Sequence, residues 1–118
     1  FGGNIRFPRI VGKTKAKEML MTGKMIDARE AWRINLVNEV VSQENLMGAV
    51  DGFCAELLNK SATVLDFIKR AVDYGTETDR NSAAQYEAAL FGVISATEDK
   101  KEGMGAFMEK RLPVFQDR

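Results

Sequence analysis

The chain has 118 residues, in which 17 Lys and Arg are balanced by 17 Asp and Glu, and it contains no His. A formal charge of zero argues against a nucleic-acid partner, whose phosphates call for excess positive charge, and against a polybasic membrane-surface protein. The absence of His removes the usual general base near neutral pH and the commonest transition-metal ligand, so we expect no metal site. From the charge, we expect neither a nucleic-acid nor a membrane partner.

The first part of the chain is predicted to be helical. Gly2 and Gly3 form an opening turn, a short helix is expected over residues 4–11, and a second helix over Lys13–Thr22. Gly23 follows the second helix, at the position where a left-handed residue commonly ends one.

A third helix is predicted to begin at Asp27. The Asp27 side chain can accept a hydrogen bond from a free amide, and Glu30, three residues later, completes a capping-box-like pair. The helix should run to about Ile34, after which Asn35 suits a left-handed backbone. Residues 36–41 read Leu-Val-Asn-Glu-Val-Val, a β-like run that predicts the one short strand of the chain.

The rest of the chain predicts further helices with identifiable start signals. They begin at Ser42, Ser61, about Ala83 and Thr97. Ser42, Ser61 and Thr97 are of the residue types favoured as caps at helix starts. The first of these helices has apolar residues at helical spacing, namely Leu46, Val50, Phe53 and Leu57. Gly75 should end the second and Pro113 the last. The predicted fold class is mainly α, with about six helices and one short strand.

Cysteine usage bears on the compartment. Cys54 is the single cysteine, so the chain has no internal disulfide, and a reducing compartment fits: the cytoplasm, or the mitochondrial matrix in a eukaryote. Cys54 lies in an apolar helical stretch and is expected to be a small buried hydrophobe rather than a reactive thiol. The chain begins with Phe1 rather than Met, which suggests a cleaved product, an artificially defined segment or a fragment of a longer polypeptide.

Several short strings follow one another at characteristic intervals. They are Gly-Gly-Asn-Ile-Arg-Phe-Pro-Arg-Ile-Val-Gly at 2–12, Thr22-Gly23, Glu30-Ala31, the run at 36–41, Ala-Thr-Glu-Asp-Lys-Lys-Glu-Gly-Met at 96–104, Ala106-Phe107 and Glu109-Lys110-Arg111. In this order they resemble the C-terminal region of the crotonase (enoyl-CoA hydratase/isomerase) family over nearly the whole chain. Asn35 departs from the usual Gly, and Ser95 stands where an aromatic residue is common.

The resemblance implies a particular place in a larger fold. Residues 1–41 would be the end of the crotonase core, a spiral of ββα units, and residues 42–118 a C-terminal helical, trimerisation-type region. Family members act on acyl-CoA thioesters and stabilise an enolate with two backbone N–H groups. They need no cofactor, since the coenzyme A thioester is the substrate. The catalytic elements of the family precede the double glycine, so we expect no catalytic residue in this chain. The trimerisation-type region implies that the complete protein is a homo-oligomer, a trimer or dimer of trimers.

The resemblance also implies a coenzyme A contact at three residues. By alignment, two aromatic residues and a lysine that cover the adenine and phosphate end of coenzyme A fall on Phe91, Phe107 and Lys110. An aromatic face can pack on adenine, and an ammonium group can meet a phosphate. The alternative is structural: both Phe residues lie on apolar helix stripes that fit a core, and Lys110 suits a helix C-terminus in any case.

Other interpretations remain open. Six glutamates are candidate acids or bases by type, and each fits a solvated helix face or a cap: Glu18, Glu30, Glu39, Glu87, Glu102 and Glu109. The chain could be a non-catalytic helical oligomerisation module, and an unrelated helical adaptor would require the strings to match by accident. The reaction within the superfamily stays open, because specificity resides in upstream loops.

Overall fold

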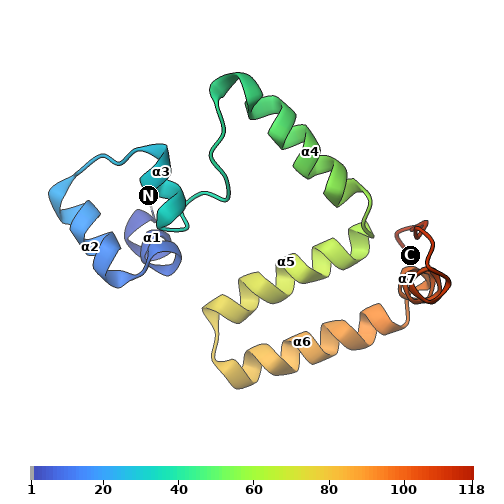
Figure 1. The fold of residues 1–118 in the computed structure, drawn as a ribbon. Helices are drawn as coiled ribbons and strands as arrows, with labels where there is room; N and C mark the ends of the chain where they lie inside the picture. Colours follow the sequence, from blue (N-terminus) through green and yellow to red (C-terminus); the bar gives the residue numbers. More distant parts are fainter. Residues whose placement is uncertain (1) are drawn as a thin grey trace. The chain divides into compact units, whose positions relative to one another are not determined.

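The computed structural model describes residues 2–118, so Phe1 lies outside the described residues. Most of the described chain is helical (Figure 1). Its elements are α1 (Gly3–Val11), α2 (Lys13–Thr22), α3 (Ala28–Arg33), the 3-10 helix η1 (Gln43–Asn45), α4 (Leu46–Leu58), α5 (Ala62–Glu77), α6 (Arg80–Ser95) and α7 (Glu98–Glu109). The chain divides into two compact units, the first ending at Ala49 and the second running over Val50–Arg118.

The mainly α prediction is confirmed, whereas the predicted strand at 36–41 is wrong. No residue from 2 to 118 forms a strand, and 36–41 is irregular chain between α3 and η1. The Leu36 N–H donates to the carbonyl of Ala31 at 2.8 Å, which belongs to a helix end rather than to a ladder. A β-like composition makes a strand only where a neighbouring strand supplies hydrogen-bond partners, and the described chain offers none.

Helices α1 and α2 of the first unit meet at a glycine. Gly12 donates its N–H to the Pro8 carbonyl at 3.0 Å, and its own carbonyl accepts from the Ala16 N–H at 3.1 Å. Gly12 thus ends one helix and starts the next, with φ 82° and ψ 157°, a conformation that is essentially restricted to glycine. The turn brings Ala16 into the small core of this unit, where it is fully buried.

Helix α3 has the termini that its sequence predicts. The Asp27 carboxylate accepts from the Glu30 N–H at 2.7 Å, and Asn35 adopts the left-handed conformation with φ 60°. The Lys15 ammonium group of α2 lies 3.1 Å from the Glu30 carboxylate, and this ion pair ties α2 to α3.

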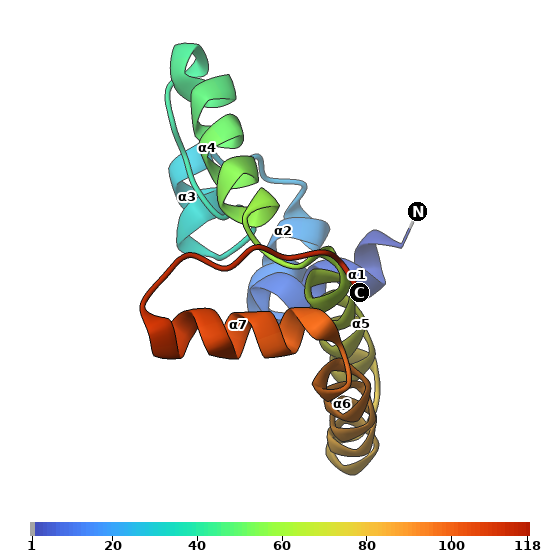
Figure 2. The same ribbon diagram turned by 90° about the vertical axis from the view of Figure 1, so that its right-hand side faces the viewer.

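An antiparallel pair of helices, α5 and α6, forms most of the second unit (Figures 1 and 2). The rings of Tyr74 and Tyr86 lie 4.6 Å apart between the two helices. Contrary to the prediction, α5 does not stop at Gly75 but continues to Glu77, and α6 begins at Arg80 after the capping residue Asp79. Gly75 does not adopt the left-handed conformation that would end the helix, and it lies close to α6: a Cβ built on it would be 3.8 Å from the Ala83 Cβ.

The helix-start predictions are confirmed at two sites and wrong at a third. The hydroxyl of Ser61 accepts from the Val64 N–H at 3.3 Å, and that of Thr97 accepts from the Lys100 N–H at 3.2 Å. Ser42 makes no capping hydrogen bond, because the chain enters α4 through the 3-10 turn η1 instead.

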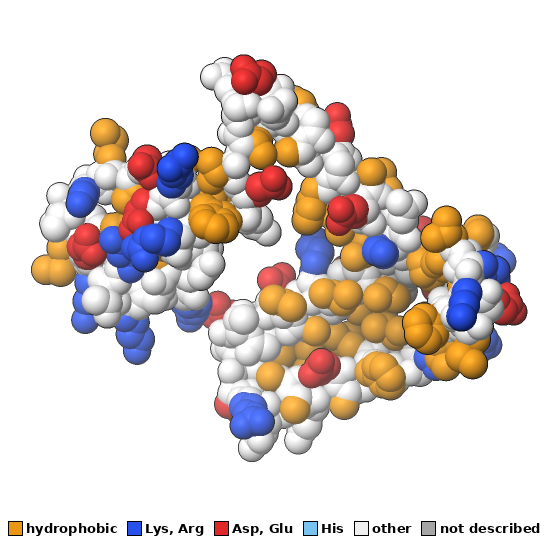
Figure 3. Space-filling view, in the orientation of Figure 1, with side chains coloured by type: hydrophobic (Ala, Val, Ile, Leu, Met, Phe, Trp, Pro, Cys, Tyr) orange, Lys and Arg blue, Asp and Glu red, His pale blue; other side chains and the backbone are white. Residues whose placement is uncertain are grey.

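Little apolar surface is buried within the described chain. The buried apolar residues are Ala16, Ala31, Ile34 and Ala106. Helix α4 buries no residue, and Cys54 within it is exposed, so the predicted burial of this cysteine is wrong for this chain. The apolar stripe that would bury it has no covering element among the described residues. Apolar side chains also line the face of α5 and α6 that Figure 3 presents.

Candidate functional site

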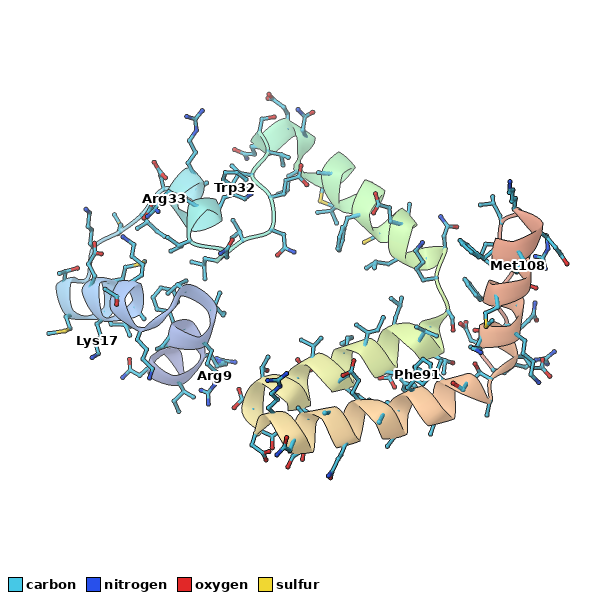
Figure 4. The ribbon with its side chains drawn as sticks, turned by 60° about the horizontal axis from the view of Figure 1, so that its bottom comes forward. Arg9, Lys17, Trp32, Arg33, Phe91 and Met108 are labelled. Carbon is cyan, nitrogen blue, oxygen red and sulfur yellow. The ribbon has the colours of Figure 1, made fainter. Side chains whose placement is uncertain are left out.

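The three candidate ligand-binding residues all lie in the second unit. Phe91 is in α6, close to the end of that helix, and Phe107 is in the last turn of α7 (Figure 4 labels Phe91). Their exposed fractions are 65% and 82%, so neither ring is buried within the described chain. Lys110 follows α7 directly, and its N–H donates to the Phe107 carbonyl at 3.2 Å.

The structure brings two of the three residues together. Phe107 and Lys110 occupy one helix end, three positions apart, whereas Phe91 comes from a different helix. Between residues 2 and 118 the close ring pair is Tyr74 with Tyr86, and no stacking of Phe91 on Phe107 occurs. The site is therefore an exposed aromatic and ammonium pair at the end of α7, with a second exposed ring on α6.

Lys110 has an unusual backbone for its residue type. Its φ of 56° and ψ of 36° are left-handed, and the following Arg111 N–H donates to the Ala106 carbonyl at 3.0 Å, as in a glycine-terminated helix. Glycine is the common residue at this position because a Cβ there is strained. Periodicity and capping rules missed this feature, since no Gly or Asn marks the helix end.

Arg111 joins the end of α7 to its middle. Its guanidinium Nη2 lies 2.9 Å from Oε2 of Glu102, and its Nε lies 2.6 Å from Oε2 of Glu109. Glu102 also accepts from the Val114 N–H at 2.8 Å. The ion pairs hold the residues beside Lys110 in one arrangement. Sequence reasoning missed this network, because its members are up to twelve positions apart.

Two candidate glutamates have electrostatic surroundings that oppose acid–base work. Hydrogen bonds from Arg33 and then Lys15 lower the pKa of Glu30 to about 2, and hydrogen bonds from Arg111 and then the Val114 N–H lower the pKa of Glu102 to about 2. A carboxyl group that transfers protons near neutral pH needs a raised pKa, close to the working pH. Both carboxylates are engaged in ion pairs, with Lys15 and Arg33 for Glu30 and with Arg111 for Glu102.

Neither a metal-ligand cluster nor a membrane span occurs in the described part of the chain. No three His, Cys, Asp or Glu side chains of residues 2–118 gather in a way that could hold a metal ion. None of the helices there is long and apolar enough to cross a bilayer.

Comparison with known proteins decides the family. The sequence pattern of the enoyl-CoA hydratase/isomerase family matches residues 1–118, which is the whole chain. The chain belongs to that family. The resemblance inferred from the short strings is thereby confirmed, and the helical fold matches the C-terminal portion of crotonase-fold structures.

Relatives in the family show how much of a subunit this chain represents. A crotonyl-CoA hydratase from Syntrophomonas wolfei is 45% identical, over 98% of this chain and 44% of the relative. A short-chain-enoyl-CoA hydratase from Clostridium acetobutylicum is 37% identical, over 100% of this chain and 46% of the relative. The crystal structure of an enoyl-CoA hydratase from Bacillus anthracis matches with a TM-score of 0.95 and 31% identity, over 99% of this chain and 45% of that one. The chain thus spans somewhat less than half the length of these relatives.

Proposed function

We propose that this chain is the C-terminal part of an enoyl-CoA hydratase/isomerase subunit that acts on acyl-CoA thioesters through a stabilised enolate. The catalytic groups then lie upstream, in sequence that corresponds to the remaining half of the relatives. Residues 1–41 would complete the crotonase core, and residues 42–118 would form the C-terminal helical region. The proposed location is the cytoplasm, or the mitochondrial matrix in a eukaryote.

The pairing of the chain's carboxylates supports upstream catalysis. Glu30 and Glu102 are held ionised by cationic partners, with pKa values of about 2, and are poor proton donors or acceptors near neutral pH. Glu18 and Glu109 likewise sit in ion pairs, with Lys15 at 3.2 Å and with Arg111.

Within such a subunit, we assign the end of α7 to the nucleotide end of coenzyme A. The observation that carries this assignment is the backbone of Lys110, a long cationic residue that occupies a left-handed position where glycine would be unstrained. Strained backbone at a site is a reason to look for function there. The neighbouring Phe107 offers an exposed ring to adenine, and Phe91 offers a second on α6.

A second role, helical self-association, is favoured by exposed apolar surface. Ile68 and Val72 of α5 are 53% and 58% exposed, and apolar side chains cover the presented face of α5 and α6 (Figure 3). Extended apolar surface of this kind marks an interaction site. We propose that it packs in a homo-oligomer, a trimer or dimer of trimers. A non-catalytic oligomerisation module would use the same surface.

Assays of two proteins test the proposal. The complete protein that contains this chain should hydrate crotonyl-CoA, and the 118-residue chain alone should not. Turnover by the chain alone that disappears in Glu30→Gln or Glu102→Gln would place the catalytic carboxylate inside it and overturn the proposal. A complete protein that neither binds nor converts acyl-CoA, yet self-associates through these helices, would favour the oligomerisation module.

A further inference from the structure

The last seven residues of the chain fold back along α7. Residues 112–118, extended, reach about 23 Å at roughly 3.3 Å per residue, enough to follow the twelve-residue helix, which is about 18 Å long. Figure 2 shows this tail returning beside α7 toward the start of the helix. Two contacts fix its course: the Val114 N–H donates to Glu102 at 2.8 Å, and Phe115 lies where a Cβ on Gly103 would be 3.5 Å from its ring.

The tail ends on a buried carboxylate. Asp99, the second residue of α7, is 2% exposed and accepts from the N–H groups of Gln116 at 2.7 Å and Asp117 at 3.0 Å. Its own N–H donates to the Arg118 carbonyl at 3.1 Å. Burial pushes the pKa of Asp99 upward, but hydrogen bonds from Ser61 and from the two tail amides together hold it below its usual value. The carboxylate is therefore ionised and its oxygens are occupied.

The same contacts reach the start of α5. The Asp117 carboxylate accepts from the Ala62 N–H at 2.6 Å, and its carbonyl accepts from the Thr63 hydroxyl at 3.1 Å. The hydroxyl of Ser61, which is also 2% exposed, hydrogen-bonds Asp99. We call Ser61, Asp99 and Asp117 the C-terminal clasp. It joins the first turn of α7, the tail and the first turn of α5.

The clasp and the proposed ligand contact lie at opposite ends of one helix. Asp99 and Lys110 are eleven residues apart, which is about 17 Å along a helix axis. The covalent link from α6 to α7 is only the two-residue turn Ala96-Thr97. A tilt of about 10° at the clasp would therefore move Lys110 by roughly 3 Å, on the same helical rise. A shift of that size breaks a hydrogen-bonded contact.

We propose that Asp99 is a positioning residue for coenzyme A: through the clasp it fixes the direction of α7 and so places Phe107 and Lys110 against the nucleotide end of the substrate. This inference rests on the proposed function. Asp99 does not touch the substrate. A residue that only stabilised the fold would affect every substrate alike. Loss of Asp99 should instead weaken the binding only of substrates that carry the nucleotide end, which α7 contacts.

Two thioesters separate positioning from stability. Crotonyl-CoA carries the adenosine phosphate end, and crotonyl-pantetheine lacks it. In the complete protein, Asp99→Asn and Lys110→Ala should each raise KM for crotonyl-CoA about fivefold, with kcat within about twofold. For crotonyl-pantetheine both constants should stay within about twofold of the parent protein. Combining Asp99→Asn with Lys110→Ala should raise KM by less than the product of the two single effects, because both substitutions act on the Lys110 contact and only the shift of Phe107 is added.

Control variants address folding and surface charge. Asp66→Asn, on the exposed side of α5 where Asp66 pairs with Arg70 at 2.9 Å, should change neither KM. If Asp99→Asn does not fold, Asp117→Asn replaces it, since Asn tolerates the left-handed φ of 59° found at Asp117 and weakens the clasp from the tail side.

The outcomes distinguish the two levels of the proposal. Equal losses on both thioesters, or a loss in kcat alone, would make Asp99 merely structural. If Lys110→Ala raises KM for crotonyl-CoA but the clasp variants Asp99→Asn and Asp117→Asn do not, the positioning role is overturned. The nucleotide contact of Lys110 then still stands. If Lys110→Ala itself does not separate the two thioesters, the nucleotide contact falls, and the positioning role falls with it.

Discussion

The guanidinium of Arg111 donates to both carboxylate oxygens of Glu102, nine residues earlier on α7. The pair closes the end of the helix onto its middle, and the Val114 N–H adds a third hydrogen bond to the same carboxylate. Because these donors favour the ionised form, the pKa of Glu102 falls from the ordinary 4.5 to about 2. Its contribution to stability is therefore complete above pH 4.5 and is lost as the pH falls toward 2.

A titration checks this pH window. The carboxyl carbon of Glu102, followed by NMR in the folded protein, should titrate with a pKa of about 2. Arg111→Gln should return the midpoint toward 4.5, since the strongest donor is gone. A midpoint near 4.5 in the unaltered protein would show that the bidentate pair does not persist in solution.

Lys110 offers a test in which stability and binding move in opposite directions. Lys110→Gly removes the ammonium group and the strained Cβ together, so the free energy of unfolding should rise by about 1 kcal/mol. Lys110→Ala removes the ammonium group and keeps the strain, so stability should stay nearly unchanged. Both variants should raise KM for crotonyl-CoA about fivefold without lowering kcat, because a contact far from the reacting bond gives uniform binding.

Urea unfolding and steady-state kinetics on the same preparations measure both effects. Lys110→Arg, which retains a cation, should keep most of the affinity. A Lys110→Gly protein that is more stable and binds crotonyl-CoA equally well would leave the left-handed lysine without a binding role.

What the sequence could predict was local. The sequence identifies Asp27, Ser61 and Thr97 as caps because a cap bonds amides only two or three residues away. Asn35 was placed in a left-handed position for a similarly local reason. The strand at 36–41 failed because strand formation depends on a partner elsewhere in the fold.

What the sequence could not predict was long-range. Asp99 resembles an ordinary acidic residue in a first helical turn, and nothing nearby indicates that it binds amides 17 and 18 positions away. The left-handed backbone of Lys110 carries no sequence signal, since the residue type argues against it. The exposure of Phe91 and Phe107 was likewise open, because an apolar stripe looks the same whether its partner is present or absent.

Ser61 should matter more than an ordinary cap. Loss of a capping hydroxyl typically costs about 1 kcal/mol, and Thr97→Ala should fall near that value. Ser61→Ala should exceed it, because the buried Asp99 carboxylate loses a donor at the same time. The free energy of unfolding from urea titrations compares the two variants, and equal losses would mean that the hydrogen bond from Ser61 to Asp99 contributes nothing.

Two glycines should respond to the same substitution with opposite signs. At Gly12 the φ of 82° and ψ of 157° exclude other residues, so Gly12→Ala should destabilise the protein by about 1 to 3 kcal/mol. Gly103 is in the interior of α7, and a Cβ there would meet Phe115 at 3.5 Å, an ordinary packing distance. Gly103→Ala should therefore stabilise the helix by up to about 1 kcal/mol.

Thermal or urea unfolding of both variants measures these changes. A loss of stability in Gly103→Ala would show that Phe115 cannot accept a methyl group beneath it, and hence that the tail lies closer to α7 than its hydrogen bonds to Asp99 and Glu102 require. A gain would mean that the tail rests on the helix with room to spare, so that the polar clasp rather than close packing fixes its position.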